Sequence, residues 1–226
     1  MNTQAWPRPR LVIFDCDGVL VDSEPVASRV VAETLSAAGW SMTAAQSHAL
    51  FLGQSLPAIY PIVAARLGEN TARRWMAGVA ENVARAMAAE AMPVPGAHAA
   101  LASVEALGLP WRIASNSSHA ELEAKLGRVA IQAAGRVHSF EDVAQGKPAP
   151  DLFLAAAAAE GVPPATCLVV EDSPIGVQAA RAAGMAVVAL VRYGSASSHR
   201  RAGARIIRDL AQLARIIGAT TEASPR

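Results

Sequence analysis

Short apolar runs alternate with helix-forming segments along most of the chain after residue 93, and this alternation strongly constrains the fold. Strands are predicted for the apolar runs at residues 111–114, 137–140, 167–170, 185–191 and 205–207. Helices are predicted between and after them, at residues 97–107, 118–126, 150–160, 174–183 and 209–217. Repeated strand–helix units favour a parallel sheet that is covered by helices on both faces.

The first strand is predicted separately, at the apolar run of residues 11–14, and a different pattern follows it. Residues 25–90 contain no strand signal. Trp75, Val79, Val83 and Met87 recur every fourth residue, which is typical of one buried helix face. An all-helical segment is therefore expected between the first strand and the rest of the sheet.

Composition limits the classes of partner. The chain has 226 residues, of which 52% are hydrophobic and 17% charged, and its formal net charge is +1. That balance gives no electrostatic reason to expect nucleic acid or an anionic membrane as partner. The first ten residues lack the apolar region of a secretory signal, and no apolar stretch is long enough to cross a bilayer. A cytoplasmic protein is expected, and a monomer by default.

Two carboxylates stand at the end of the first predicted strand, in Asp15-Cys16-Asp17-Gly18. Ligands of open α/β sheets bind at the carboxyl ends of strands. Carboxylates this close repel each other unless they share a proton or bind a hard cation. The alternative is a simple turn, because Asp and Gly both favour turns.

Two later segments offer groups that suit a phosphate. Ser115 and Asn116 follow the strand at 111–114 and precede a helix, where a hydroxyl and backbone N–H groups can hold phosphate oxygens. Helix capping would explain the nearby Ser117 or Ser118 equally well. Lys147, which with Lys125 makes up all the lysine in the chain, could stabilise a phosphoryl transition state. Its alternative is a solvated loop lysine.

A second pair of acids, Glu171 and Asp172, follows the strand at 167–170. Charged groups rarely occupy such buried positions unless they are paired or bind metal. With Asp15 and Asp17 they would place four carboxylates around one dianionic phosphate. This arrangement requires a divalent cation, and oxygen ligands alone favour Mg²⁺. Asp172 or Ser173 could also cap the following helix.

These four segments, taken in order from residue 15 to 173, resemble the four signatures of the haloacid dehalogenase superfamily. The chain looks most like the branch that contains β-phosphoglucomutase and sugar-phosphate phosphatases. The resemblance implies an α/β fold with a Rossmann-like three-layer α/β/α core, a parallel sheet and an inserted all-helical cap. The core domain would comprise residues 1–22 and 91–226, and the cap residues 23–90.

The resemblance also implies a role for each residue. Asp15 would be the nucleophile that forms an aspartyl-phosphate, and Asp17 the acid and base. Ser115 and Lys147 would bind the transferred phosphate, with Asn116 beside them. The metal would be Mg²⁺, bound by the carboxylates of Asp15 and Asp172 and by the backbone carbonyl of Asp17, with Glu171 binding it directly or supporting its ligands.

The predicted function is hydrolysis of a small phosphorylated metabolite, such as a sugar phosphate. Asp17 disfavours dehalogenase and phosphonatase chemistry, which needs no acid at that position. A phosphosugar mutase is the alternative, but the cap-loop segment Gly53-Gln54-Ser55 lacks the cation with which such mutases hold a second phosphate. These three residues are candidate substrate contacts, although they could form an ordinary turn. A phospho-ligand-binding protein without catalysis is a further alternative.

Overall fold

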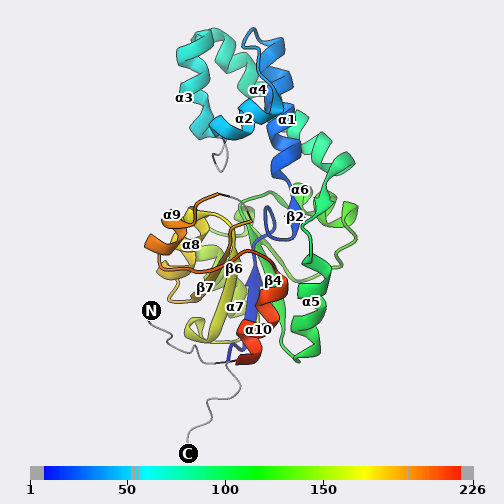
Figure 1. Cartoon of the computed structure of the whole chain (residues 1–226), viewed down its shortest axis with the longest axis vertical. Helices are drawn as coiled ribbons and strands as arrows, with labels where there is room; N and C mark the ends of the chain where they lie inside the picture. The colour runs from blue at the N-terminus through cyan, green and yellow to red at the C-terminus, as the bar shows by residue number, and fades with distance from the viewer. Residues whose placement is uncertain (1–7, 52–53, 55, 193, 220–226) are drawn as a thin grey trace, which may run out of the picture.

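The computed structural model describes residues 8–51, 54, 56–192 and 194–219. The described chain forms a sheet-containing core and a group of helices that stands beyond one end of the sheet (Figure 1). The chain enters the helical group after its first strand and returns from it to build the remainder of the sheet.

The core is built on a six-stranded sheet in the order β5-β4-β1-β6-β7-β8. Every neighbouring pair of strands in it is parallel. The strands are β1 (Leu11–Phe14), β4 (Trp111–Ser115), β5 (Val137–Ser139), β6 (Cys167–Glu171), β7 (Ala186–Leu190) and β8 (Arg205–Ile207). The central strand β1 lies between β4 and β6, so the residues after it occupy the middle of the sheet's carboxyl edge.

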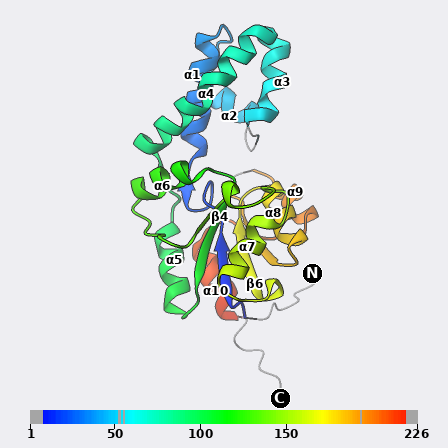
Figure 2. The same cartoon turned by 180° about the vertical axis from the view of Figure 1, so that it is seen from behind.

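Helices cover both faces of this sheet, as the view from behind also shows (Figure 2). Val12 and Phe14 of β1 pack on one face with α5 (Ala97–Ala106), α6 (His119–Arg128) and α10 (Ala211–Ala219). Leu11 and Ile13 point to the opposite face and pack with α7 (Asp151–Ala159) and α8 (Pro174–Ala182). Side chains alternate between the two faces of a strand, which explains why a continuous apolar run fits the middle layer.

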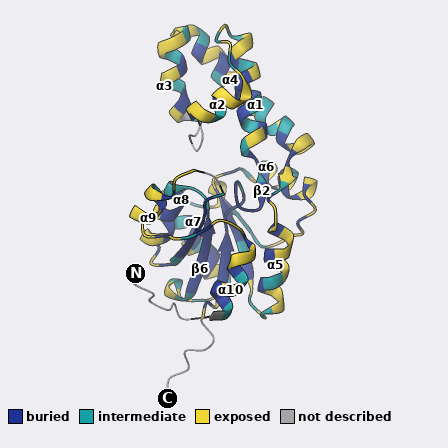
Figure 3. Ribbon diagram, in the orientation of Figure 1, coloured by how far each residue is buried: buried dark blue, intermediate teal, exposed yellow. Residues whose placement is uncertain are grey.

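The helical group consists of α1 (Glu24–Ala37), α2 (Ala44–Phe51), α3 (Leu56–Leu67) and α4 (Glu69–Glu90). Its core is distinct from that of the sheet and contains Leu35, Phe51, Val63, Trp75 and Val79. The buried stripe appears dark on the inner sides of these helices in Figure 3. A short antiparallel pair, β2 (Val21–Asp22) with β3 (Met92–Pro93), joins the chain where it leaves and re-enters the core.

The predicted α/β class with a parallel sheet and an inserted helical cap is confirmed. We propose the cap limits of residues 23–90, which place the boundaries beside β2 and β3. The final helix was expected at 209–217 and begins at Ala211 instead, because Asp209 accepts a hydrogen bond from the Ala211 amide at its N-terminus, 2.7 Å. The structure adds α9 (Ser197–Arg201) and two single 3₁₀ turns, Phe140–Asp142 and Pro164–Thr166, that the periodicity did not indicate. None of the described helices has the length and apolar character needed to cross a membrane.

Candidate active site

The candidate site lies at the carboxyl edge of the sheet, where three neighbouring strands end. Asp15 directly follows β1, Ser115 ends β4 and Glu171 ends β6. The sheet pattern continues one residue past β1, because the Asp15 amide donates to the Val170 carbonyl at 2.9 Å. All three residues line one cavity of about 990 Å³ that extends toward the helical group. This is the edge at which open α/β sheets bind their ligands.

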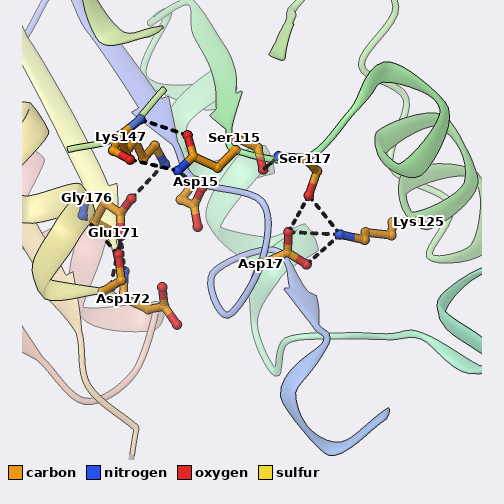
Figure 4. A network of polar contacts seen from close by, with 11 residues as sticks. Asp15, Asp17, Ser115, Ser117, Lys125, Lys147, Glu171, Asp172 and Gly176 are labelled. Atoms are coloured by element: carbon orange, nitrogen blue, oxygen red, sulfur yellow. Dashed lines mark hydrogen bonds and ion pairs between the residues drawn. The ribbon is translucent and has the colours of Figure 1, made fainter. Parts of the chain in front are cut away.

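A buried lysine joins two of these strand ends (Figure 4). Lys147 Nζ donates to Asp15 Oδ1 at 2.6 Å and to Glu171 Oε1 at 2.7 Å. Burial raises the pKa of Asp15 to about 7, helped by the nearby charges of Glu171 and Asp17 and opposed by Lys147. Burial would lower the pKa of Lys147, but the charges of Asp15 and Glu171 raise it, so this side chain is a fixed cation. The predicted alternative of a solvated loop lysine does not fit these contacts.

Glu171 holds the loop between β6 and α8. Its second oxygen, Oε2, accepts from the backbone amides of Asp172 and Ser173, both at 2.9 Å, and from the Ser173 hydroxyl at 3.0 Å. Ser173 in turn caps α8 by accepting from the Gly176 amide. Both carboxylate oxygens of Glu171 are therefore engaged, one by Lys147 and one by the loop that carries Asp172.

Gly176 leaves the space that Glu171 occupies. A Cβ at Gly176 would lie 1.6 Å from Glu171 Oε1 and 1.9 Å from its Cδ, far inside contact distance. We expect Gly176→Ala to push Glu171 off Lys147 and to lower the free energy of unfolding by about 1–3 kcal/mol. Denaturant titration measures this loss.

Gly78→Ala is the matched control, because Gly78 lies inside α4 with no atom near its added Cβ. Gly78→Ala should leave the free energy of unfolding unchanged or raise it by up to about 1 kcal/mol. A free energy of unfolding of Gly176→Ala equal to that of the wild type would contradict the steric account.

Asp15, Glu171 and Asp172 form a candidate metal centre. One carboxylate oxygen from each lies within 4.8 Å of the others. Burial raises the pKa of Asp172 well above its ordinary value, and the charges of Glu171 and Asp15 raise it further. A buried acidic group of this kind gains from a nearby divalent cation, and a set of oxygen donors suits Mg²⁺. The residues present therefore fit the predicted Mg²⁺.

Gly18 allows Asp172 to approach the first loop. It has a φ of +74°, which disfavours residues with a side chain, and a Cβ there would lie 1.8 Å from Asp172 Oδ2. The close approach of these two loops brings Asp172 to Asp15, although the residues belong to different strand ends. The Asp-Gly pair thus has a packing reason beyond turn formation.

The Asp17 carboxylate lies outside the acidic group and is held by a second network. Lys125 Nζ donates to both Asp17 oxygens at 3.0 Å, and the Ser117 hydroxyl donates to Asp17 Oδ2 at 2.9 Å. Figure 4 shows Asp17 turned toward Lys125 and Ser117 and away from Lys147 and Glu171. The metal contact predicted for Asp17 involves its backbone carbonyl, and it stays a prediction.

Ser115 and Asn116 differ in how they meet the cavity that they both line. The Ser115 hydroxyl accepts from the Ser117 amide at 3.2 Å and is buried. The Asn116 side chain binds the backbone of Lys147 on both sides: it accepts from the amide at 2.8 Å and donates to the carbonyl at 3.0 Å. Asn116 thus fixes the loop that carries Lys147, whereas its predicted contact with substrate stays a prediction. Ser118, not Ser117, caps α6.

The helical group contributes few described residues to the cavity wall, among them His48 and Gln54. The His48 Nδ1 atom lies 3.2 Å from the Ser28 hydroxyl, which fixes the ring on α2. Gln54 donates to the Leu50 carbonyl at 3.0 Å. The predicted contacts Gly53 and Ser55 lie outside the described residues.

Sequence reasoning assigned Ser117 only a possible helix cap and gave Lys125 no role. One signal was available, because Lys125 occupies the apolar face of α6 between the buried Leu122 and Leu126. Arg192 was missed as well. It lines the cavity from the core and pairs with Asp22, with nitrogen–oxygen distances of 2.5 Å and 3.0 Å.

Comparison with known proteins gives a consistent group of relatives. The sequence model of a hydrolase family, the haloacid dehalogenase-like hydrolases, matches residues 9–184. Hexitol phosphatase A of Escherichia coli is 32% identical over 189 residues, which cover 79% of this chain and 81% of that protein. The 6-phosphogluconate phosphatase of Escherichia coli is 31% identical over 183 residues, covering 80% of this chain and 81% of that protein.

Other relatives are longer than this chain or are known as structures. Suppressor of Quenching 1 of Arabidopsis thaliana is 30% identical over 92% of the chain, yet the chain spans only 20% of that protein. A HAD family hydrolase of Deinococcus radiodurans, crystallised with phosphate and sodium, superposes with a TM-score of 0.82 at 28% identity. The match covers 97% of this chain and 99% of that one.

Proposed function

Because the chain belongs to the haloacid dehalogenase-like hydrolases, we propose that it is a Mg²⁺-dependent phosphatase of a small phosphorylated metabolite. One observation carries the proposal. The buried Asp15 lies at the end of the central strand and accepts a hydrogen bond from Lys147, and one of its oxygens lies within 4.8 Å of an oxygen of Asp172 at the next strand end. A nucleophile, a fixed cation and a metal-binding group in one cavity are the parts that phosphoryl transfer requires.

Asp15 is the proposed nucleophile. One of its oxygens attacks phosphorus in line, forming an acyl phosphate as the bond from phosphorus to the ester oxygen breaks. Water then attacks the same phosphorus, which releases inorganic phosphate and restores the Asp15 carboxylate. Mg²⁺, when bound by Asp15 and Asp172, supplies charge stabilisation to the phosphoryl oxygens.

The other residues divide the remaining tasks. Lys147 balances negative charge beside Asp15, while Glu171 positions Lys147 and the loop of Asp172 through its two engaged oxygens. Ser115 offers its hydroxyl to the phosphate at the adjacent strand end. Asp17, when protonated, donates its proton to the departing alkoxide and then accepts one from the attacking water.

The cavity favours a hydroxyl-rich substrate with a single phosphate. Its volume of about 990 Å³ accommodates a sugar or polyol phosphate together with ordered water. No lysine or arginine occurs among the described residues of 23–90 that line it. A mutase must hold a second phosphate at the cap, so this wall favours the phosphatase. Hexitol phosphatase A and 6-phosphogluconate phosphatase, both relatives, are named for substrates of this class.

Phosphate release from a panel of hexitol, hexose and sugar-acid phosphates tests the proposal. We expect release with Mg²⁺ and at least about a tenfold loss when EDTA removes the metal, because the acidic group then faces the phosphate without a cation. Restoring Mg²⁺ should restore the rate, which controls for damage by the chelator. An isomerised sugar phosphate without net phosphate release would instead identify a mutase. Metal binding without turnover of any ester would indicate a non-catalytic binder.

A further inference from the structure

Lys125 is a buried cation that the proposed mechanism leaves without a task. Its side chain is only 8% exposed, on the apolar face of α6. Its ammonium donates to Asp17 Oδ1 and Oδ2 at 3.0 Å each and to the Ser117 hydroxyl at 2.9 Å. An ammonium has three N–H donors, and these three oxygens satisfy all of them.

Such an arrangement is costly unless it is complete. Burying a lysine side chain is unfavourable unless its charge is paired, because the ammonium loses the hydration that it has at the surface. The pairing also spans 108 residues of sequence, from the loop after β1 to α6. Local helix formation therefore does not explain why the lysine lies here.

Lys125 differs from the groups that would contact substrate in its position relative to the cavity. Asp17 and Ser117 are among the described residues that line the cavity, whereas Lys125 is not. Asp17 is also the more exposed partner, with 32% of its side chain accessible. The lysine thus lies behind the acid, out of reach of a bound phosphate ester.

We propose that Lys125 is a positioning residue that keeps the Asp17 carboxylate apart from Asp15 and Lys147. This inference rests on the proposed function, because it concerns the residue assigned to proton transfer. Asp17 lies only two residues after the nucleophile, and Lys147 is a buried cation that lines the same cavity. Without Lys125, the Asp17 carboxylate would be drawn toward Lys147 and away from the departing alkoxide, because opposite charges attract strongly in a buried site.

Lys125→Met tests this role. We expect kcat for an alkyl phosphate to fall about ten- to a hundredfold, the usual cost of a misplaced catalytic group, while KM changes little. The loss should be much smaller with p-nitrophenyl phosphate, because its leaving group needs little protonation. Ser117→Ala, which preserves both bonds from Lys125 to Asp17, should cause a smaller loss of the same kind.

A double-mutant cycle asks whether Lys125 acts through Asp17. In an Asp17→Asn background, Lys125→Met should change kcat by no more than about twofold, since residues that act as a unit are not additive. Leu126→Ala is the matched control on the same helix, because Leu126 is buried in the hydrophobic core and its apolar side chain forms none of the hydrogen bonds of the network. It should lower the unfolding midpoint and leave kcat and its leaving-group dependence unchanged.

Two kinds of result, one kinetic and one structural, would overturn the inference. One is an equal loss for alkyl and aryl esters, or an undiminished loss in the Asp17→Asn background, either of which marks Lys125 as merely structural. The other is a crystal structure of Lys125→Met in which Asp17 keeps its orientation; we expect it to turn toward Lys147. The crystal structure decides even if the wild-type protein hydrolyses none of the esters, an outcome that would refute the proposed phosphatase instead.

Discussion

Asp15→Asn should lower the rate of phosphate release by at least about a thousandfold, the scale of losing a catalytic nucleophile. The amide has nearly the same shape as the carboxylate, so it can remain beside Lys147, but it lacks the negative charge that attacks phosphorus. Steady-state assays on the best substrate of the panel measure the effect.

A change of charge alone does not explain such a loss if a remote aspartate tolerates the same substitution. Asp209→Asn supplies this control, because Asp209 lies at the N-terminus of α10 and accepts a hydrogen bond from the Ala211 amide. It should retain near wild-type turnover. Substantial activity in Asp15→Asn would show that phosphoryl transfer does not require this carboxylate.

Asp17→Asn should produce the second large effect, a loss of about 10²–10⁴ in kcat for alkyl phosphates, typical of a missing general acid and base. The asparagine can still accept from Lys125 and Ser117 through its side-chain oxygen, so the protein should fold. Its free energy of unfolding should fall, because Lys125 loses its paired charge. The loss in kcat arises because an amide cannot deliver a proton to the departing alkoxide.

A series of esters with increasingly acidic leaving groups tests whether the loss comes from missing proton donation. The deficit of Asp17→Asn should shrink as the leaving group becomes a better one, because proton donation then matters less to bond cleavage. The wild-type protein, measured on the same esters, is the reference. A deficit that stays constant across the series would contradict the assignment of Asp17 as acid.

The central part of the site could be predicted because its acidic residues directly follow apolar strands in the sequence. The strand β1 (Leu11–Phe14) is an apolar run that suits the middle of a sheet, and Asp15 ends this run at the strand end. The same reasoning applies to Glu171, which ends the buried strand β6. A carboxylate at such a position must find a cation or a hydrogen-bond donor, and this requirement is visible in the sequence.

The parts that could not be predicted depend on contacts between distant segments. Lys125 lies on the apolar face of α6, but its partner Asp17 lies 108 residues earlier, so the helix alone does not reveal which charge the lysine pairs with. The bonds between the Asn116 side chain and the backbone of Lys147 join residues 31 positions apart, so the sequence did not reveal them, and the predicted substrate contact of Asn116 stays a prediction. The pair β2–β3 has two residues in each strand, too few to produce a periodic signal.

The most direct test of the central claim is to find where the phosphoryl group goes during turnover. Acid quenching during turnover with the best substrate, followed by peptide mass spectrometry, would detect a phosphoryl group carried by the protein. We expect it on the peptide that contains Asp15, removable by hydroxylamine as an acyl phosphate is, and absent in Asp15→Asn. A phosphoryl group on another residue, such as Ser115, or phosphate release without any phosphorylated protein, would contradict the mechanism.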